Sequence, residues 1–381
     1  MTLLIFSLTL VAATLLSEWA SRSVFSTAVL FLGVGALAGG RLDSFPSDLD
    51  SLRVVVEVTL FAVLFVDGMK LGLSGTRSGR PLAGRTLLVG LPLTLALIAV
   101  AARWLLDVSW HNAFLLGAML APTDPVLAEA VVGRKAIPER VRNLLNVESG
   151  LNDGLTLPCF LFLLYWGAGE GAPLQLAGQA ALGVILGMAL PWAVIKLEKK
   201  SALAASEEYK AISMIAIASV LFSTCRLLHA NELLAGFISG IVLGRLAPTF
   251  RDAFHDFGEN LTELLKLGAL FLFSGVTVGR GIDHHSAADY LFALAVLIAA
   301  RPLAILVATV KSEITTAERL TIAWFGPKGF ATVFYSLLIL NTAYSSKDFI
   351  FSICGLTVSI SILLHSSTDV AIARWFRGKT V

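Results

Sequence analysis

Long apolar stretches alternate with short polar segments along the whole chain. A hydrocarbon core about 30 Å thick is crossed by roughly 20 mainly apolar residues in an α-helix. By this criterion the sequence predicts 13 spans and an all-α polytopic membrane protein. The predicted spans are residues 2–18, 24–40, 52–71, 86–106, 112–133, 140–166, 173–196, 209–227, 231–247, 261–279, 288–310, 318–341 and 348–373.

The composition agrees with this pattern. Hydrophobic residues make up 56% of the chain and charged residues 15%, and the mean hydropathy is +0.80. These values argue against a soluble protein, and a net charge of +2 without a basic stripe predicts no nucleic-acid partner. The three cysteines lie singly in apolar runs, so we expect neither a disulfide framework nor a metal site. No basic residue precedes the first span, which we expect to remain uncleaved.

Basic residues are distributed unevenly between alternating loops. Twenty of the 29 Lys and Arg residues lie in the loops after odd-numbered spans or in the C-terminal tail, and six lie in the other loops. Short loops rich in Lys and Arg stay in the cytoplasm. We therefore expect the N-terminus outside and the C-terminus in the cytoplasm of a cell membrane, which requires an odd number of spans.

The pattern of spans is duplicated. Spans 1 and 8, and spans 6 and 13, begin about 200 residues apart. Spans 5 and 12 are each interrupted by a polar patch with Pro, APTDP at 121–125 and FGPKG at 325–329. Because matching spans are an odd number apart, we expect two inverted six-helix repeats, in which paired interruptions indicate a transporter's binding site. The alternative is that apolar helices recur at this spacing by chance.

Span 6 carries a polar sector inside its apolar run. Its members are Glu148, Ser149, Asn152 and Asp153. All four fall within about 140° on a helix with 3.6 residues per turn. An ionisable group at bilayer depth costs several kcal/mol, so two carboxylates here imply a partner, a cation or a water-filled cavity.

The interruption of span 5 combines two prolines with oxygen ligands. Pro122 and Pro125 remove main-chain donors and open the helix, which frees carbonyl groups such as that of Thr123. A hydroxyl, a carboxylate from Asp124 and free carbonyls suit a small hard cation. The alternative is a proline kink in which Asp124 caps the half-helix that follows it.

Two basic residues lie inside spans of the second half. We expect Lys328, in the interruption of span 12, to offset the negative C-terminal end of a half-helix, and Asp124 to offset a positive N-terminal end. Alternatively, Lys328 snorkels to the surface. Arg301 cannot usefully deprotonate and needs an anion. Glu148 is the best candidate, and a half-helix C-terminus or another acid is the alternative.

Several motifs together resemble those of the monovalent cation/proton antiporters, in the sodium/proton exchanger branch with Asn-Asp on the sixth span. They are APTDPVLA at 121–128, ESGLNDG at 148–154, ARPL at 300–303 and GPKG at 326–329, supported by Asp67-Gly68 and His365. The resemblance covers nearly the whole chain. It implies a six-helix core, about 86–166 and 288–373, with two crossed, broken helices. This core would move against a dimerisation domain, about 1–72 and 209–279, with a linker helix at about 173–196.

The resemblance also implies roles for single residues. Asp153 is the carboxylate that cation and proton share, and the residues that complete or support the cation shell are Thr123, Asp124, Ser149 and Glu148. Asn152 replaces a second aspartate of the electrogenic branch, and Arg301 replaces a titrating lysine, which points to electroneutral one-for-one exchange. Lys328 departs from a more usual arginine, and no cytoplasmic regulatory domain is expected after the last span.

The expected function is exchange of Na⁺ or Li⁺ for H⁺ by alternating access, for pH and sodium homeostasis. The expected partners are these transported ions, the lipid bilayer and a second copy in a homodimer; no cofactor is expected. The alternatives are a K⁺/H⁺ antiporter of the same fold and an uncoupled cation channel. An intramembrane enzyme is disfavoured because the sequence has neither HExxH nor a Ser/His pair at motif spacing.

Overall fold

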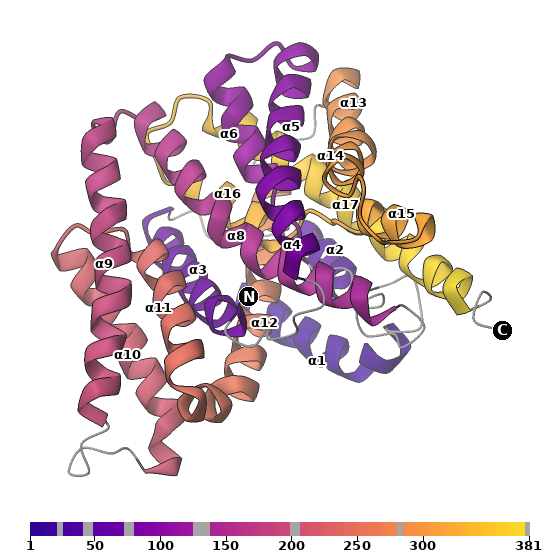
Figure 1. Cartoon of the computed structure of the whole chain (residues 1–381). Helices are drawn as coiled ribbons and strands as arrows, with labels where there is room; N and C mark the ends of the chain where they lie inside the picture. The colour runs from indigo at the N-terminus through magenta and orange to yellow at the C-terminus, as the bar shows by residue number, and fades with distance from the viewer. Residues whose placement is uncertain are drawn as a thin grey trace. The chain divides into compact units, whose positions relative to one another are not determined.

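The computed structural model describes residues 1–20, 26–40, 49–71, 80–124, 138–198, 206–279 and 285–377. Within these ranges the chain is helical and contains no strand (Figure 1). The first-half helices are α1 (Thr2–Ala20), α2 (Thr27–Gly39), α3 (Leu49–Leu71), α4 (Arg80–Arg85), α5 (Leu91–Leu105), α6 (Trp110–Leu120) and α8 (Glu139–Gly167). The others are α9 (Pro173–Glu198), α10 (Glu207–Leu227), α11 (Glu232–Leu246), α12 (Pro248–Gly279), α13 (Ala287–Ala295), α14 (Arg301–Ala308), α15 (Thr316–Trp324), α16 (Phe330–Leu340) and α17 (Lys347–Arg377).

Helices occupy all 13 predicted spans, apart from the stretch of span 5 after Asp124, which lies outside the described residues. Six of the described helical segments are long and apolar enough to cross a membrane by length and composition. The largest difference from prediction is α12, which begins at Pro248 and not near residue 261. Residues 248–260 are polar enough to lower the hydropathy, yet no proline follows Pro248 to stop the helix.

Spans 4 and 11 share an irregularity that the sequence reading did not predict. A π-helical turn, Thr86–Gly90, joins α4 to α5, and another, Val296–Ala300, joins α13 to α14. Each turn is followed by a proline near the start of the next helix segment, Pro92 or Pro302. Proline removes a main-chain donor and crowds the preceding turn, and a π turn is one way to accommodate both effects. Matched π turns in both halves support the duplication.

By internal contacts the chain divides into two compact units. The first comprises Met1–Arg53, Thr76–Asn152 and Leu267–Val381, and the second comprises Val54–Gly75 and Asp153–Lys266. The functional division into a core and a dimerisation domain stays a prediction.

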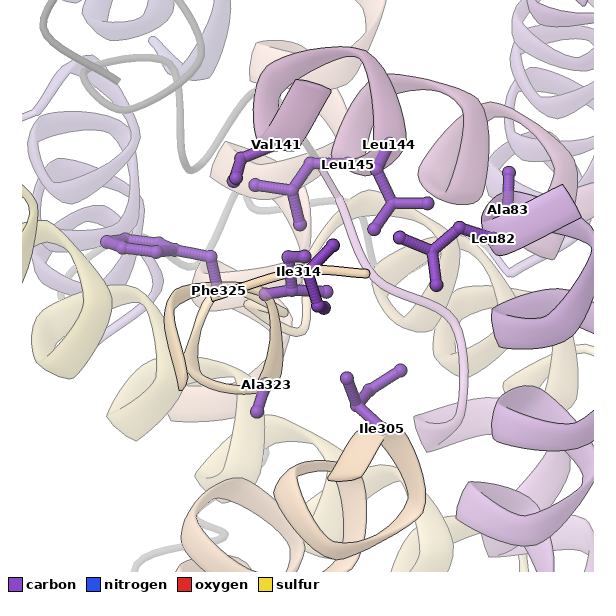
Figure 2. Close-up of a cluster of buried hydrophobic side chains, with 10 residues drawn as sticks. Leu82, Ala83, Val141, Leu144, Leu145, Ile305, Ile314, Ala323 and Phe325 are labelled. Atoms are coloured by element: carbon purple, nitrogen blue, oxygen red, sulfur yellow. The ribbon is translucent and has the colours of Figure 1, made fainter. Parts of the chain in front are cut away.

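A buried apolar cluster in the first unit ties α4, α8, α14 and α15 together (Figure 2). Its members are Leu82, Ala83, Val141, Leu144, Leu145, Ile305, Ile314, Ile322, Ala323 and Phe325. Leu144 and Leu145 lie one turn before Glu148 on α8, and Phe325 lies directly after α15. The cluster therefore anchors the segments from which the buried charges of this unit project.

The second unit is built around close helix packing. On α11, a Cβ atom at Gly240 would lie 2.1 Å from the Phe65 carbonyl oxygen of α3, and one at Gly244 would lie 2.5 Å from the Met69 carbonyl oxygen. Real Cβ atoms do not approach other atoms so closely, so these positions require glycine. The small-residue face of α11 thus serves packing inside one chain.

Candidate functional site

Two helix interruptions meet in the first unit. α15 ends at Trp324, residues 325–329 are not helical, and α16 begins at Phe330. α6 ends at Leu120, after which Pro122 to Asp124 are not helical. The main-chain N–H of Asp124 donates to the Pro327 carbonyl at 3.0 Å. The two non-helical segments that the sequence predicted therefore meet, and the continuation beyond Asp124 lies outside the described residues.

The Asp124 carboxylate caps the helix of the other repeat. Its Oδ2 accepts the main-chain N–H of Phe330, the first residue of α16, at 3.1 Å. The side chain is buried. The negative charge thus lies where the helix dipole of α16 is positive, as predicted for an N-terminal helix end.

Lys328 is buried beside the C-terminal end of α6. It is 0% exposed, and its Nζ donates to the carbonyl oxygens of Ala121 and Pro122 at 3.3 and 3.4 Å. These carbonyls lie just after the C-terminal end of α6, where the helix dipole is negative. Lys328 thus contacts a C-terminal helix end, as the sequence predicted, and its side chain does not snorkel to the surface.

Arg301 has both of the partners that the sequence left as alternatives. Its Nη1 donates to Glu148 Oε1 at 2.5 Å, and its Nη2 donates to the carbonyl of Phe325 at 3.0 Å, past the C-terminal end of α15. Both charged side chains are buried. A Cβ atom at Gly326 would lie 1.6 Å from Arg301 Nε, so the glycine of the interruption leaves room for the guanidinium.

Asn152 attaches α8 to the first interruption. Its Nδ2 donates to Thr123 Oγ1 at 2.7 Å and to the Thr123 carbonyl at 3.3 Å. Glu148 lies one turn earlier on α8, and its Oε2 is buried with no hydrogen-bond partner among the described residues. Thr123 thus presents its oxygens to α8, while Glu148 keeps one oxygen beyond its ion pair. The Ser149 side chain lies outside what the structure describes.

Asp153 follows Asn152 on α8 and belongs to the second unit. The residue as a whole is partly exposed, although its carboxylate oxygen Oδ1 is buried, whereas Glu148 and Asn152 are buried residues. The Thr156 hydroxyl donates to the Asp153 main-chain carbonyl at 3.3 Å.

Residues of α17 complete the second interruption, and sequence reasoning did not single them out as site residues. Ser361 Oγ accepts the main-chain N–H of Lys328 at 2.7 Å, and the His365 Nε2 atom lies 3.2 Å from the Trp324 carbonyl. The available signal was a polar row at Thr357, Ser361 and His365, spaced four residues apart in an apolar span.

The oxygen atoms near the two interruptions are of the kind that bind hard cations. The described residues contain no group of three or more His, Cys, Asp or Glu side chains placed to hold a metal ion. Hydroxyl, carbonyl and carboxylate oxygens such as those of Thr123, Asp124 and Glu148 are hard ligands. An ion bound by few charged ligands is easier to release than one held in a closed cage.

Helix interruptions at corresponding positions of the two halves, which meet beside buried charges of both signs, are typical of secondary transporters built from repeats. The family model for the transmembrane part of sodium/hydrogen exchangers matches residues 5–375. The chain belongs to this sodium/hydrogen exchanger family, whose members are transporters and not enzymes.

Individual relatives are more distant. The K(+)/H(+) antiporter NhaP2 of Shewanella oneidensis is 25% identical, over 97% of this chain and 66% of its own length. The K(+)/H(+) antiporter NhaP of Alkalimonas amylolytica is 23% identical, over 96% of this chain and 65% of its own length. This chain thus spans about two thirds of these relatives. The sodium proton antiporter MjNhaP1 of Methanocaldococcus jannaschii has the same fold, with a TM-score of 0.81 at 20% identity, over 99% of this chain and 100% of that one.

Proposed function

We propose that this protein exchanges a monovalent cation for a proton by alternating access. The main observation behind the proposal is that the buried charges near the two interruptions are bonded to main-chain groups or to each other. Asp124, Lys328 and Arg301 each bond to main-chain groups at a helix interruption, and Glu148 pairs with Arg301. Asp153 is the partly exposed acid of the α8 polar sector and is our candidate for the group that changes its ligand.

Competition at Asp153 produces the coupling. A cation requires the ionised carboxylate, and a proton removes the charge that binds the cation. Exchange is obligatory if the core moves only when one of the two ligands is bound. In this proposal Thr123, Asp124, Ser149 and Glu148 complete or support the cation shell.

We propose a stoichiometry of one proton per cation. Asn152 has no titratable group, and an arginine side chain is a poor proton carrier. The electrogenic branch has an aspartate and a titrating lysine at these two positions, and this chain has neither of them. Transport is then electroneutral.

The cation is Na⁺ or Li⁺ in the proposal that follows from the sequence motifs. K⁺ is the second candidate, and the observation that favours it is the printed description of two relatives as K(+)/H(+) antiporters. The structural neighbour is described as a sodium proton antiporter. Cavity size and ligand field decide between these ions.

We further propose a homodimer in the cell membrane, with the N-terminus outside and the C-terminus in the cytoplasm, that serves pH and sodium homeostasis. Residues 86–166 and 288–373 form the moving core in this proposal. Residues 1–72 and 209–279 form the dimerisation domain, and residues 173–196 link the two.

The decisive experiment uses proteoliposomes with a pH-sensitive dye inside. Each alkali chloride is added in turn, and cation-dependent dequenching reports exchange. Asp153→Asn should abolish it, while Asp107→Asn, which changes an acid with a 93% exposed side chain, should leave it intact. Robust exchange by a folded D153N variant would contradict the role of Asp153.

The same vesicles test the stoichiometry and the channel alternative. An imposed membrane potential should leave the turnover unchanged if exchange is electroneutral. A clear dependence of turnover on the potential would refute one-for-one exchange. Cation current without proton movement would instead indicate an uncoupled channel.

A further inference from the structure

A polar row on α17 faces the interruption between α15 and α16. Ser361 and His365 are both buried and lie one turn apart. Each contacts one end of residues 324–328, which run from the last residue of α15 into the non-helical segment that carries Lys328 and contacts Arg301. The segment is therefore held from α17 at two points.

The first point is a main-chain bond at Lys328. Its N–H donates to Ser361 Oγ at 2.7 Å. A buried N–H in a helix interruption has no intrahelical partner, and an unpaired one is costly. Ser361 thus sets the position of the Lys328 backbone, from which the side chain reaches the carbonyls at the end of α6.

The second point is the Trp324 carbonyl. His365 Nε2 lies 3.2 Å from it, and the rings of Trp324 and His365 lie 5.6 Å apart. The Trp324 indole N–H also donates to Thr368 Oγ1, one turn further along α17, at 3.1 Å. The last residue of α15 is therefore held to α17 by main chain and side chain together.

The His365 ring lies between Ser361 and Trp324. Its Nδ1 lies 2.8 Å from the Ser361 carbonyl and 3.3 Å from the Ser361 hydroxyl, and its Nε2 lies 3.2 Å from the Trp324 carbonyl. A neutral imidazole carries one N–H and donates to one of the two carbonyls. A row of polar contacts therefore runs from the Lys328 N–H through Ser361 and His365 to the Trp324 carbonyl.

We propose that Ser361 and His365 are positioning residues for transport. They fix residues 324–328, and through them the Lys328 ammonium and the Phe325 carbonyl that Arg301 contacts. This inference rests on the proposed function in one respect: cation binding requires that the groups at the two interruptions keep their positions. Among the described residues, the charged groups that act electrostatically on the His365 ring are the cations Lys328 and Arg301, and Arg301 is paired with Glu148.

Hydrogen exchange tests the positioning without any transport. Overlapping peptides that contain Lys328 are followed by mass spectrometry in the detergent-solubilised full chain. Ser361→Ala should speed exchange of the Lys328 amide by about tenfold, since one hydrogen bond is lost. Thr357→Val is the matched control, because within the described part of the chain that hydroxyl bonds only the Ile353 carbonyl of its own helix, at 2.8 Å, and its loss should leave the Lys328 amide unchanged.

Proteoliposome kinetics test the consequence. Ser361→Thr and Ser361→Val have the same shape, and only the first keeps the hydroxyl. We expect Ser361→Val to raise the cation KM by about tenfold and Ser361→Thr to restore it. Likewise His365→Gln, which keeps an N–H donor, should restore function that His365→Leu loses. If the longer side chains at 361 do not fold, Ser361→Ala supplies the same comparison against Thr357→Val.

The two readouts separate the inference from the proposed function. Equal Lys328 amide exchange in Ser361→Ala and Thr357→Val overturns the positioning role, whatever the transport data show. Equal cation KM in the Ser361→Thr and Ser361→Val variants also overturns it. The wild-type protein could fail to transport cations against protons while the Lys328 amide exchange still differs between the variants as expected. The proposed function would then fail, and the positioning of residues 324–328 by α17 would still hold.

Discussion

The buried charges at the helix crossing and the charged cluster of α3 and α12 in the second unit are held in different ways. At the crossing, Asp124 and Lys328 bond to main-chain groups at helix ends, and Arg301 bonds to both a carbonyl and Glu148. These hydrogen bonds measure 2.5–3.3 Å, and the side chains are almost entirely buried. Helix dipoles and hydrogen bonds thus compensate the charges of these buried side chains.

In the second unit, charged side chains pair mainly with one another. Lys266 and Lys70 each lie 3.8 Å from an Asp67 oxygen. Lys70 also lies 3.2 Å from Glu259, which His255 approaches to 3.7 Å. The side-chain exposure rises along this cluster, from 8% at Lys266 to 46% at Glu259. Water therefore screens one end of the cluster.

The difference separates fixed charge from adaptable charge. A main-chain partner cannot rotate away, so a charge bonded to a helix end has one position. A pair of long side chains near water has many positions of similar free energy, and its net contribution is small. A transport site needs the first kind where its geometry must persist between states.

The largest expected effect concerns the ion pair of Arg301 and Glu148. Removing one partner of a buried pair costs about 3–5 kcal/mol, because the other charge is left uncompensated. Arg301→Ala and Glu148→Ala should each lower the detergent melting temperature sharply. The double variant should cost less than the sum of the two losses. If the two stability losses simply add, the residues are not coupled as an ion pair. Glu148 would then be free to serve as a direct cation ligand.

Replacement of Lys328 tests the helix-end bonds without an acid partner. Lys328→Met keeps the length of the side chain and removes the donor, which leaves the Ala121 and Pro122 carbonyls unpaired. We expect a loss of about 1–3 kcal/mol in the free energy of unfolding. Lys328→Arg keeps a cation and donors and should lose less. Equal melting temperatures for the Met and Arg variants would show that the helix-end bonds have no weight.

Asp124 allows charge and hydrogen bond to be separated. Asp124→Asn keeps an acceptor for the Phe330 N–H and loses the charge, at a cost of about 0.3–1 kcal/mol. Asp124→Ala loses both, at a cost of about 1–2 kcal/mol. The two variants are compared by thermal melting in one detergent. An Asn variant as unstable as the Ala variant would assign the whole effect to charge.

The smallest effect is expected in the second unit. Lys70→Ala should change the free energy of unfolding by no more than about 1 kcal/mol, since exposed pairs contribute little. Raising the salt concentration should remove that difference, whereas the losses at Arg301 and Lys328 should persist because buried groups are screened less. If the stability loss of Lys70→Ala did not depend on salt, the exposed pairs and the buried helix-end charges would not differ in the way described here.

The sequence by itself determined the helices and the chemistry available to them. Apolar runs of bilayer length predicted the spans, and prolines located both interruptions. Arg301 in an apolar run required an anion, which identified Glu148 as a partner. These inferences succeed because hydropathy, main-chain donors and buried charge are properties of each local segment.

Only the tertiary structure decided which groups meet. Asp124 caps α16, 206 positions away, and Lys328 bonds to Ala121, 207 positions away. Asn152 bonds to Thr123, and Ser361 holds the Lys328 backbone. Main-chain groups freed by an interruption are the same in every residue, so no side-chain pattern tells which of them will be near a given charge. That choice is made when the two halves of the repeat pack across each other.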